Sequence, residues 1–216
     1  MIEKMLDLIE KTFPLTELPC GDYEKLKVNG LTFRIRRFLA EGLGNVSVMA
    51  ASGFLGLMNM DTLIITPTER DMPLLSYDRV LAMGNDTLIF ELYDTLLGEA
   101  DLSALDEAKQ TGAHLPEHDL GSHWYDSIKL PQSISKKGKK AQRAEFDAVA
   151  DHYLAQYLAA ARNASVCDAA PKREKAGVYA EGLLTNGGPS TEVFKKGIGD
   201  KKTAELFRKV LFATEV

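Results

Sequence analysis

Residues 61–94 read DTLIITPTERDMPLLSYDRVLAMGNDTLIFELYD, and this stretch decides the fold class of the chain. Two runs in it, DTLIITPT and TLIFELYD, have the β-branched and aromatic composition of strands, and SYDRVLAMG lies between them. The connections between the runs, one of them a Gly-Asn-Asp turn, are too short for crossover helices. The stretch therefore predicts consecutive antiparallel strands.

The strand pattern extends toward the N-terminus. The run LTFRIRRF, residues 31–38, alternates apolar and basic side chains, which is the period of a half-buried strand. The run GNVSVMAAS, residues 44–52, follows a Gly-containing turn and is expected to be its hairpin partner. Residues 1–13 have apolar residues at near-helical spacing and predict an amphipathic helix.

The second half of the chain has helical patterns. We predict helices over residues 96–110 and 138–163, a helix that begins near Ser190, and a last one over 201–212. Strands followed by helices indicate an α+β fold, with one mainly antiparallel sheet and helices packed on it. No linker or internal repeat is evident, so we expect a single domain over residues 1–216.

Composition limits the class of protein. The formal net charge is −5 and the pI is about 5.5, which disfavours a general nucleic-acid binder. Cys20 and Cys167 lie far apart in sequence and suit a reducing cytoplasm. No run approaches the roughly 20 apolar residues of a membrane span, and the N-terminus lacks a signal-peptide pattern. We expect a soluble cytoplasmic protein.

Common catalytic and nucleotide-binding motifs are missing from the sequence. The glycine-rich piece NGGPST, residues 186–191, matches neither a P-loop nor GxGxxG, so it predicts a loop and a helix N-cap. No GxSxG nucleophile motif is present.

A histidine-rich loop is one candidate for chemistry. The segment HLPEHDLGSH supplies His114, His118, Asp119 and His123, whose imidazole and carboxylate groups suit zinc or another transition metal. Pro116 and Gly121 interrupt helical spacing, which favours a solvated surface loop.

Asp78 and a basic run are the other candidates. Apolar residues flank Asp78, so its carboxyl is expected to be partly desolvated, and burial raises the pKa of a carboxylic acid toward that of a proton donor. A structural acid paired with Arg79 is the alternative interpretation. The basic run, from Lys136 to Arg143, is expected to be the solvated start of a helix, where positive charge is electrostatically unfavourable. That conflict favours an anionic partner or ligand.

The ending TEVFKKGIGDKKTAELFRKVLF resembles the ending of ferredoxin-dependent bilin reductases. The resemblance is carried by Ile198-Gly199-Asp200 and Val210-Leu211-Phe212, and by the Pro-Leu segment that precedes Asp78. Asp94, Trp124 and the long helix after the lysines keep the family's order. The sequence resembles red chlorophyll catabolite reductases to the same degree.

The resemblance implies a three-layer α/β/α sandwich with a central antiparallel sheet. It implies that an open-chain tetrapyrrole binds between the sheet and the C-terminal helices. Ferredoxin would supply single electrons, the pigment would carry the radical, and the protein would supply protons. No flavin, nicotinamide or metal cofactor is implied.

Individual residues take roles from the resemblance. Asp78 matches the aspartate that touches the pyrrole nitrogens and delivers a proton, and Lys136 falls near the basic residue that pairs with a propionate. From strand alternation we infer that Arg34 and Arg36 share a face and serve the other propionate.

The chain also departs from the family pattern. Ile64 stands near a family histidine, Ser52 stands at a family glutamate and is placed in the substrate site, and Pro189 stands at a family lysine.

Three hypotheses follow. The first is a reductase of linear tetrapyrroles fed by ferredoxin or flavodoxin, with Asp78 as the proton donor and Lys136, Lys137, Lys139 and Lys140 steering the acidic donor. The second is a non-catalytic tetrapyrrole-binding protein, which the missing histidine and glutamate favour. The third is a metal-dependent enzyme that uses the histidine-rich loop.

Overall fold

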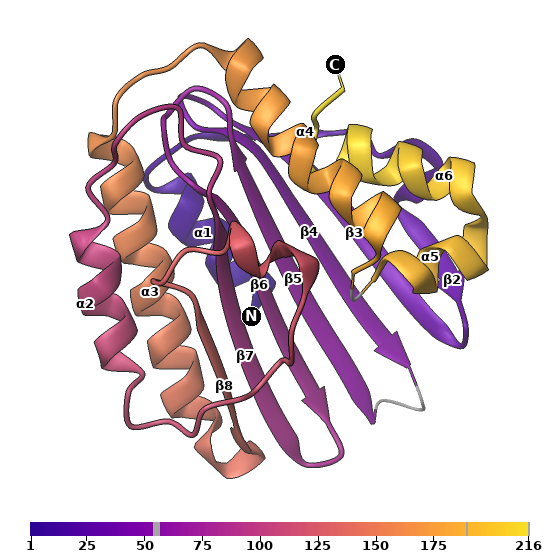
Figure 1. Ribbon diagram of the computed structural model, residues 1–216. Coiled ribbons are helices and arrows are strands. Elements are labelled where there is room, and N and C mark those ends of the chain that lie inside the picture. The colour runs from indigo at the N-terminus through magenta and orange to yellow at the C-terminus, as the bar shows by residue number, and fades with distance from the viewer. Residues whose placement is uncertain (54–56, 189, 216) are drawn as a thin grey trace.

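The structure, a computed structural model, describes residues 1–53, 57–188 and 190–215 and is built around an eight-stranded antiparallel sheet (Figure 1). The strand order is β1-β3-β4-β5-β6-β7-β8, and β2 also pairs with β3. The strands are β1 Leu15–Leu18, β2 Lys25–Val28, β3 Leu31–Ala40, β4 Gly44–Gly53, β5 Met58–Pro67, β6 Leu74–Ala82, β7 Asn85–Tyr93 and β8 Ile134–Lys139.

The middle of the sheet is the meander that the sequence predicts. Each of the strands β3 to β7 pairs antiparallel with the strand that follows it in the chain. The pairing brings Thr62 opposite Asp78, and Ser76 opposite Glu91. Because directly paired residues place their side chains on the same face of a sheet, this register decides which polar groups meet.

Helices cover both faces of the sheet (Figure 1). α1, α2 and α3 lie on one side, and α4, α5 and α6 lie on the other. None of the helices in the described part of the chain is long and apolar enough to cross a bilayer. The helices are α1 Ile2–Glu10, α2 Ser103–Thr111, α3 Arg143–Asn163, α4 Ala169–Asn186, α5 Thr191–Ile198 and α6 Asp200–Glu205, with short turns η1 Gly21–Tyr23, η3 Trp124–Ser127 and η4 Lys140–Gln142 and the π-helical segment η5 Leu206–Leu211.

Each face of the sheet has its own apolar core. Met5 of α1 and Phe146 of α3 pack with Tyr77 and other sheet residues in one core. Tyr179 of α4 and Phe194 of α5 belong to the second core, on the opposite face. Alternation along the strands separates the two sets, since neighbouring residues point to opposite faces. The α+β prediction with a central antiparallel sheet is therefore confirmed.

Two helix boundaries were predicted wrongly. The predicted helix over residues 138–163 begins only at Arg143, because Lys136 to Lys139 form the edge strand β8 against β7. The predicted helix over 96–110 begins at Ser103, because the backbone amides of Leu97 and Gly98 bond the carboxylate of Asp71 instead of forming a helical turn. Helix α4 and the strands β1 and β2 were not predicted.

The C-terminal layer is tied to the sheet by polar contacts to η5. The Ser47 hydroxyl donates a hydrogen bond to the Leu211 carbonyl at 2.8 Å, and the Asn45 amide donates to the same carbonyl at 3.2 Å. These bonds satisfy a backbone carbonyl at the end of a helical segment, where no partner exists within the helix. The final Val-Leu segment is thereby anchored over β4.

Gly182 and Gly177 of α4 provide a matched test of how this layer packs. A Cβ atom at Gly182 would overlap the indole of Trp124, whereas a Cβ at Gly177 would lie 3.9 Å from Thr214. We expect Gly182→Ala to lower the free energy of unfolding by about 1–3 kcal/mol through overpacking. Gly177→Ala should raise it by about 0.5–1 kcal/mol through helix propensity. Denaturant unfolding checks both, and equal effects would contradict this packing.

Candidate functional site

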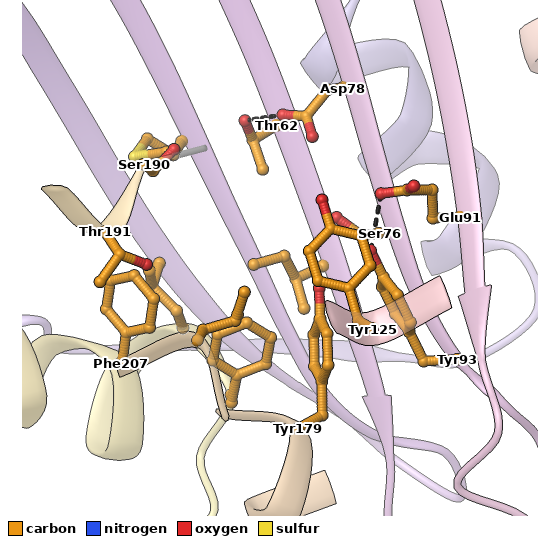
Figure 2. Close-up of a pocket in the computed structure, with 15 residues that line it drawn as sticks. Thr62, Ser76, Asp78, Glu91, Tyr93, Tyr125, Tyr179, Ser190, Thr191 and Phe207 are labelled. Carbon is orange, nitrogen blue, oxygen red and sulfur yellow. Dashed lines mark hydrogen bonds between the residues drawn. The ribbon is translucent and has the colours of Figure 1, made fainter. Parts of the chain in front are cut away.

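A cavity of about 70 Å³ lies between the sheet and the C-terminal layer (Figure 2). Its sheet wall carries polar groups, and its helical wall is mainly apolar and aromatic. The polar groups of the sheet wall are Thr62, Ser76, Asp78 and Glu91. The opposite wall includes Tyr125, Tyr179, Leu183, Thr191, Phe207 and Phe212.

Asp78 stands in the middle of β6 and lines the cavity. The Thr62 hydroxyl on the paired strand donates a hydrogen bond to its carboxylate. Desolvation by the surrounding protein raises the pKa of Asp78 to about 6, the Thr62 bond opposes the rise, and the negative charge of Glu91 adds to it. A carboxyl with this pKa carries or releases a proton near neutrality, which is the property of a general acid. The sequence-based expectation of a desolvated carboxyl is met.

Glu91 supplies a second acid that the sequence analysis did not single out. It is 8% exposed and lines the same cavity from β7. Its Oε2 atom accepts a hydrogen bond from the Tyr93 hydroxyl at 2.6 Å. Its Oε1 atom has no hydrogen-bond partner among the described residues and lies 3.7 Å from the Lys129 ammonium. The only sequence signal was a glutamate placed between apolar residues in the run IFELY.

Three tyrosines form an aromatic surface beside the two acids (Figure 2). Tyr93 and Tyr179 stack with ring centroids 4.0 Å apart, and Tyr125 meets Tyr93 edge-on at 5.5 Å. Burial raises the pKa of all three phenols, so their hydroxyls stay protonated. Flat conjugated molecules stack favourably on such rings.

Thr191 adds an unsatisfied hydroxyl on the helical wall. Its residue is 1% exposed, and Oγ1 has no hydrogen-bond partner within the described residues. Together with Glu91 Oε1, it leaves polar atoms without a hydrogen-bond partner in the described chain on both walls of the cavity. Buried polar groups without partners are costly in a structural core, so a bound water or ligand atom that satisfies them would be stabilised there.

The raised pKa of Asp78 predicts a specific dependence of stability on pH. Its folded-state pKa of about 6 lies above the value of about 3.9 for an unfolded aspartate. The folded state therefore holds the proton more tightly, and this favourable contribution is complete below pH 4 and lost as pH rises through 6. We expect the free energy of unfolding to fall by about 1–2 kcal/mol across that window relative to Asp78→Asn. Urea unfolding of both proteins from pH 4 to 7.5 measures this, and parallel curves would contradict the assignment.

The four residues predicted to bind substrate lie on the opposite face of the sheet from Asp78. Register places Arg34 beside Ala50, Ala50 beside Asp61, Asp61 beside Arg79, and that row continues to Lys136. Arg79 adjoins Asp78 on the same strand, so its row faces the other way. Arg36 and Ser52 belong to the same face by alternation. The prediction that Lys136, Arg34, Arg36 and Ser52 share a site with Asp78 is corrected by this register.

Two of these side chains have other partners. Arg36 forms ion pairs with Glu17 and with Glu3 of α1. Lys136 is 3% exposed and pairs with Glu117. Lys137, the next residue of β8, points to the Asp78 face and is exposed.

The histidine-rich loop does not assemble as a metal site. Over residues 1–53, 57–188 and 190–215, no three side chains of the types His, Cys, Asp and Glu gather around one point. His114 lies 3.5 Å from Glu145, and His123 stacks on Tyr125 with centroids 4.8 Å apart. The set His114, His118, Asp119 and His123 is therefore not a candidate ligand sphere in the described chain.

Two positions that depart from the family pattern, Ile64 and Pro189, and one that keeps it, Asp94, remain to be placed. Ile64 lines the cavity on the strand that precedes Asp78. Asp94 lies at the end of β7, is exposed, and accepts a hydrogen bond from the Leu96 amide. Pro189 lies outside the described residues.

Comparisons with known proteins identify the fold. No protein-family model matches the chain, and no curated protein matches it by sequence. Among solved structures, phytochromobilin synthase from tomato, in complex with biliverdin, matches with a TM-score of 0.80 over 99% of this chain and 82% of that one, at 15% sequence identity. The chain therefore has the fold of phytochromobilin synthase, the fold that the resemblance to bilin reductases predicted.

Proposed function

We propose that this chain, as one bilin-reductase-like domain, binds a linear tetrapyrrole in the cavity beside Asp78 and reduces it. The observation that carries the proposal is Asp78 itself, a carboxyl with a pKa of about 6 in a cavity that stacked tyrosines and a second acid also line. The fold match supports the substrate class, because the matched structure holds biliverdin. Pyrrole N–H groups are donors, and the carboxylates of the sheet wall are acceptors.

The reaction requires two electrons and two protons for each double bond that is reduced. In the proposal, ferredoxin or flavodoxin is oxidised and delivers the electrons singly, with no bound cofactor. Asp78 transfers its proton to the pigment, and Glu91 or solvent provides the second proton. Two carboxyls in one cavity, one of them with a raised pKa, are suited to sequential proton delivery.

Charge at the β8 edge supports an acidic electron donor. Lys137, Lys139 and Lys140 are exposed at this edge, whereas Lys136 is buried in its pair with Glu117. Exposed lysines accelerate encounters with a protein of opposite charge. We propose that Lys137, which faces the Asp78 side, takes the role assigned to Lys136 and pairs with a propionate of the pigment.

The size of the cavity sets a requirement on binding. Its volume of about 70 Å³ is far below the roughly 300–1,000 Å³ of most ligand pockets. A tetrapyrrole therefore needs the C-terminal layer to move outward from the sheet. Hydrogen exchange of α4 and η5 amides with and without biliverdin follows this movement.

Ile64 favours the second candidate, a binding protein that does not turn the pigment over. It lines the cavity near the place of a family histidine and cannot transfer a proton. Titration with biliverdin, followed by visible absorption, tests binding for both candidates. A saturating spectral shift is expected, and no binding at micromolar pigment would overturn both.

Thr191→Val separates ligand binding from stability. The substitution keeps the side-chain shape and removes the unpaired hydroxyl. We expect the free energy of unfolding to rise by about 0.5–2 kcal/mol and biliverdin affinity to fall about threefold to tenfold. Urea unfolding and absorption titration measure the two effects. A loss of stability would mean that the hydroxyl has a structural partner, and unchanged affinity would exclude it from the ligand site.

A further inference from the structure

A second crevice lies on the Asp78 face of the sheet, and Arg37 of β3 lines it. It has a volume of about 400 Å³. Register places Arg37 in the row of Ser47, Ile64 and Ser76, three strands from β6 and hence about 14 Å from Ser76. The segment η5 separates the two spaces, since Val210 lines the crevice whereas Leu211 lines the cavity. The crevice is therefore distinct from the proposed tetrapyrrole site.

The guanidinium of Arg37 is held in place from one side only. Its Nε atom donates to Asn45 Oδ1 at 2.7 Å, and the buried Asn45 is itself fixed because its amide donates to the carbonyls of Leu211 and Val210. No ion pair of Arg37 exists among the described residues, so neither Nη1 nor Nη2 is engaged by a carboxylate. The bond to Asn45 orients the guanidinium, a group that can bind a carboxylate through two parallel hydrogen bonds.

The charge of Arg37 is not compensated by nearby acids. Lys209 lies 3.2 Å from Glu205, and Glu205 also accepts the Tyr23 hydroxyl at 2.9 Å, so both are engaged. Arg37 and Lys202 form no ion pair in the described part of the chain. The remaining carboxylate of the lining is that of Asp22, which is exposed. Half-buried arginines without an acidic partner are uncommon because desolvation is costly, and burial here lowers the pKa of Arg37.

The rest of the lining is apolar. Leu26 of β2, Ile198 of α5 and Val210 of η5 line the crevice together with Arg37. A crevice with one fixed guanidinium and apolar walls suits a molecule with an anionic group and an apolar body. Inorganic anions would leave these walls uncovered.

We propose that the crevice lined by Arg37 binds a small organic carboxylate. The carboxylate group pairs with the Arg37 guanidinium, and the apolar part of the molecule packs against Leu26 and Ile198. Lys202 contributes charge at the rim. The site is separate from the Asp78 cavity in this conformation, and the proposal does not rest on tetrapyrrole reduction.

Calorimetric titration with phenylacetate tests the proposal. We expect saturable binding that weakens at least about tenfold in Arg37→Gln, because the substitution removes the charged bidentate contact. Arg34→Gln is the matched control, since Arg34 lies on the same strand with its side chain on the opposite face. Equal binding by wild type and Arg37→Gln, or equal losses in both variants, would overturn the proposal.

Two further measurements test the proposal if Arg37→Gln does not fold. The neutral isostere phenylacetamide should bind wild-type protein at least about tenfold more weakly than phenylacetate. Lys202→Gln, a change at an exposed residue, should weaken phenylacetate binding about twofold to fivefold. Equal binding of the acid and the amide would exclude an anion site, and tighter binding of inorganic phosphate than of phenylacetate would exclude the organic carboxylate class.

Discussion

Asp78→Asn is expected to lower the rate of biliverdin reduction by about 10²–10⁴-fold while leaving biliverdin binding unchanged. Asparagine keeps the shape of the side chain and can still accept the Thr62 hydrogen bond. It cannot release a proton, so only the transfer step is lost. Single-turnover kinetics with reduced ferredoxin, followed by visible absorption, measures the rate separately from binding.

Two variants serve as controls for this result. Asp94→Asn changes an exposed aspartate outside the cavity and should leave turnover unchanged. Glu91→Gln changes the second acid and should slow turnover less than Asp78→Asn, because Glu91 is proposed to share its role with solvent. Full activity of Asp78→Asn combined with an inactive Glu91→Gln would transfer the role of proton donor to Glu91.

Lys172→Met should lower the free energy of unfolding by about 3–5 kcal/mol, the largest stability effect that we predict. Lys172 of α4 is completely buried, and its ammonium donates to Asp71 at 2.9 Å and to the carbonyls of Met72 and Thr95 at 2.7 Å. Removing the ammonium leaves a buried carboxylate and two carbonyls without their partner. Urea unfolding at pH 7 measures the loss.

The same helix offers a control for Lys172. Lys175→Met removes an exposed ammonium one turn away and should change stability by less than about 0.5 kcal/mol. Adding Asp71→Asn to Lys172→Met should restore part of the loss, because no unpaired charge then remains and the asparagine oxygen can still accept a backbone amide of the Leu97–Gly98 segment. A loss below about 1 kcal/mol for Lys172→Met would show that the buried pair does not hold α4 on the sheet.

Local pattern predicts the parts of the fold whose burial follows a simple period. Strand β3 was predicted because its side chains alternate, and the strands that follow it because of their β-like runs and short turns. Helix α1 was predicted because its apolar residues form one stripe. Strand β8 was not predicted, because its lysines lie at a sheet edge and the buried Lys136 ammonium finds its partners, Glu117 and the Leu115 carbonyl, in a preceding loop. Helix α4 was not predicted because it buries Lys172 and two alanines among few large apolar residues.

The candidate site was predictable only in part, for a geometric reason. The apolar residues around Asp78 indicated its desolvation, which depends on local sequence. The face to which Lys136 or Arg34 points relative to Asp78 depends on strand register, and a shift of one residue reverses it. Tyr125 and Thr191 join the cavity from segments distant in sequence, so no local pattern indicated them.

Anaerobic mixing of the biliverdin complex with reduced ferredoxin tests the central claim most directly. We predict that the absorption of the bound pigment bleaches in two one-electron steps and that a dihydro product is recovered after oxidation of two equivalents of ferredoxin. Asp78→Asn should bind the pigment and form the radical but accumulate no product. A stable complex whose spectrum never changes under reduced ferredoxin would contradict reduction and leave a tetrapyrrole-binding protein.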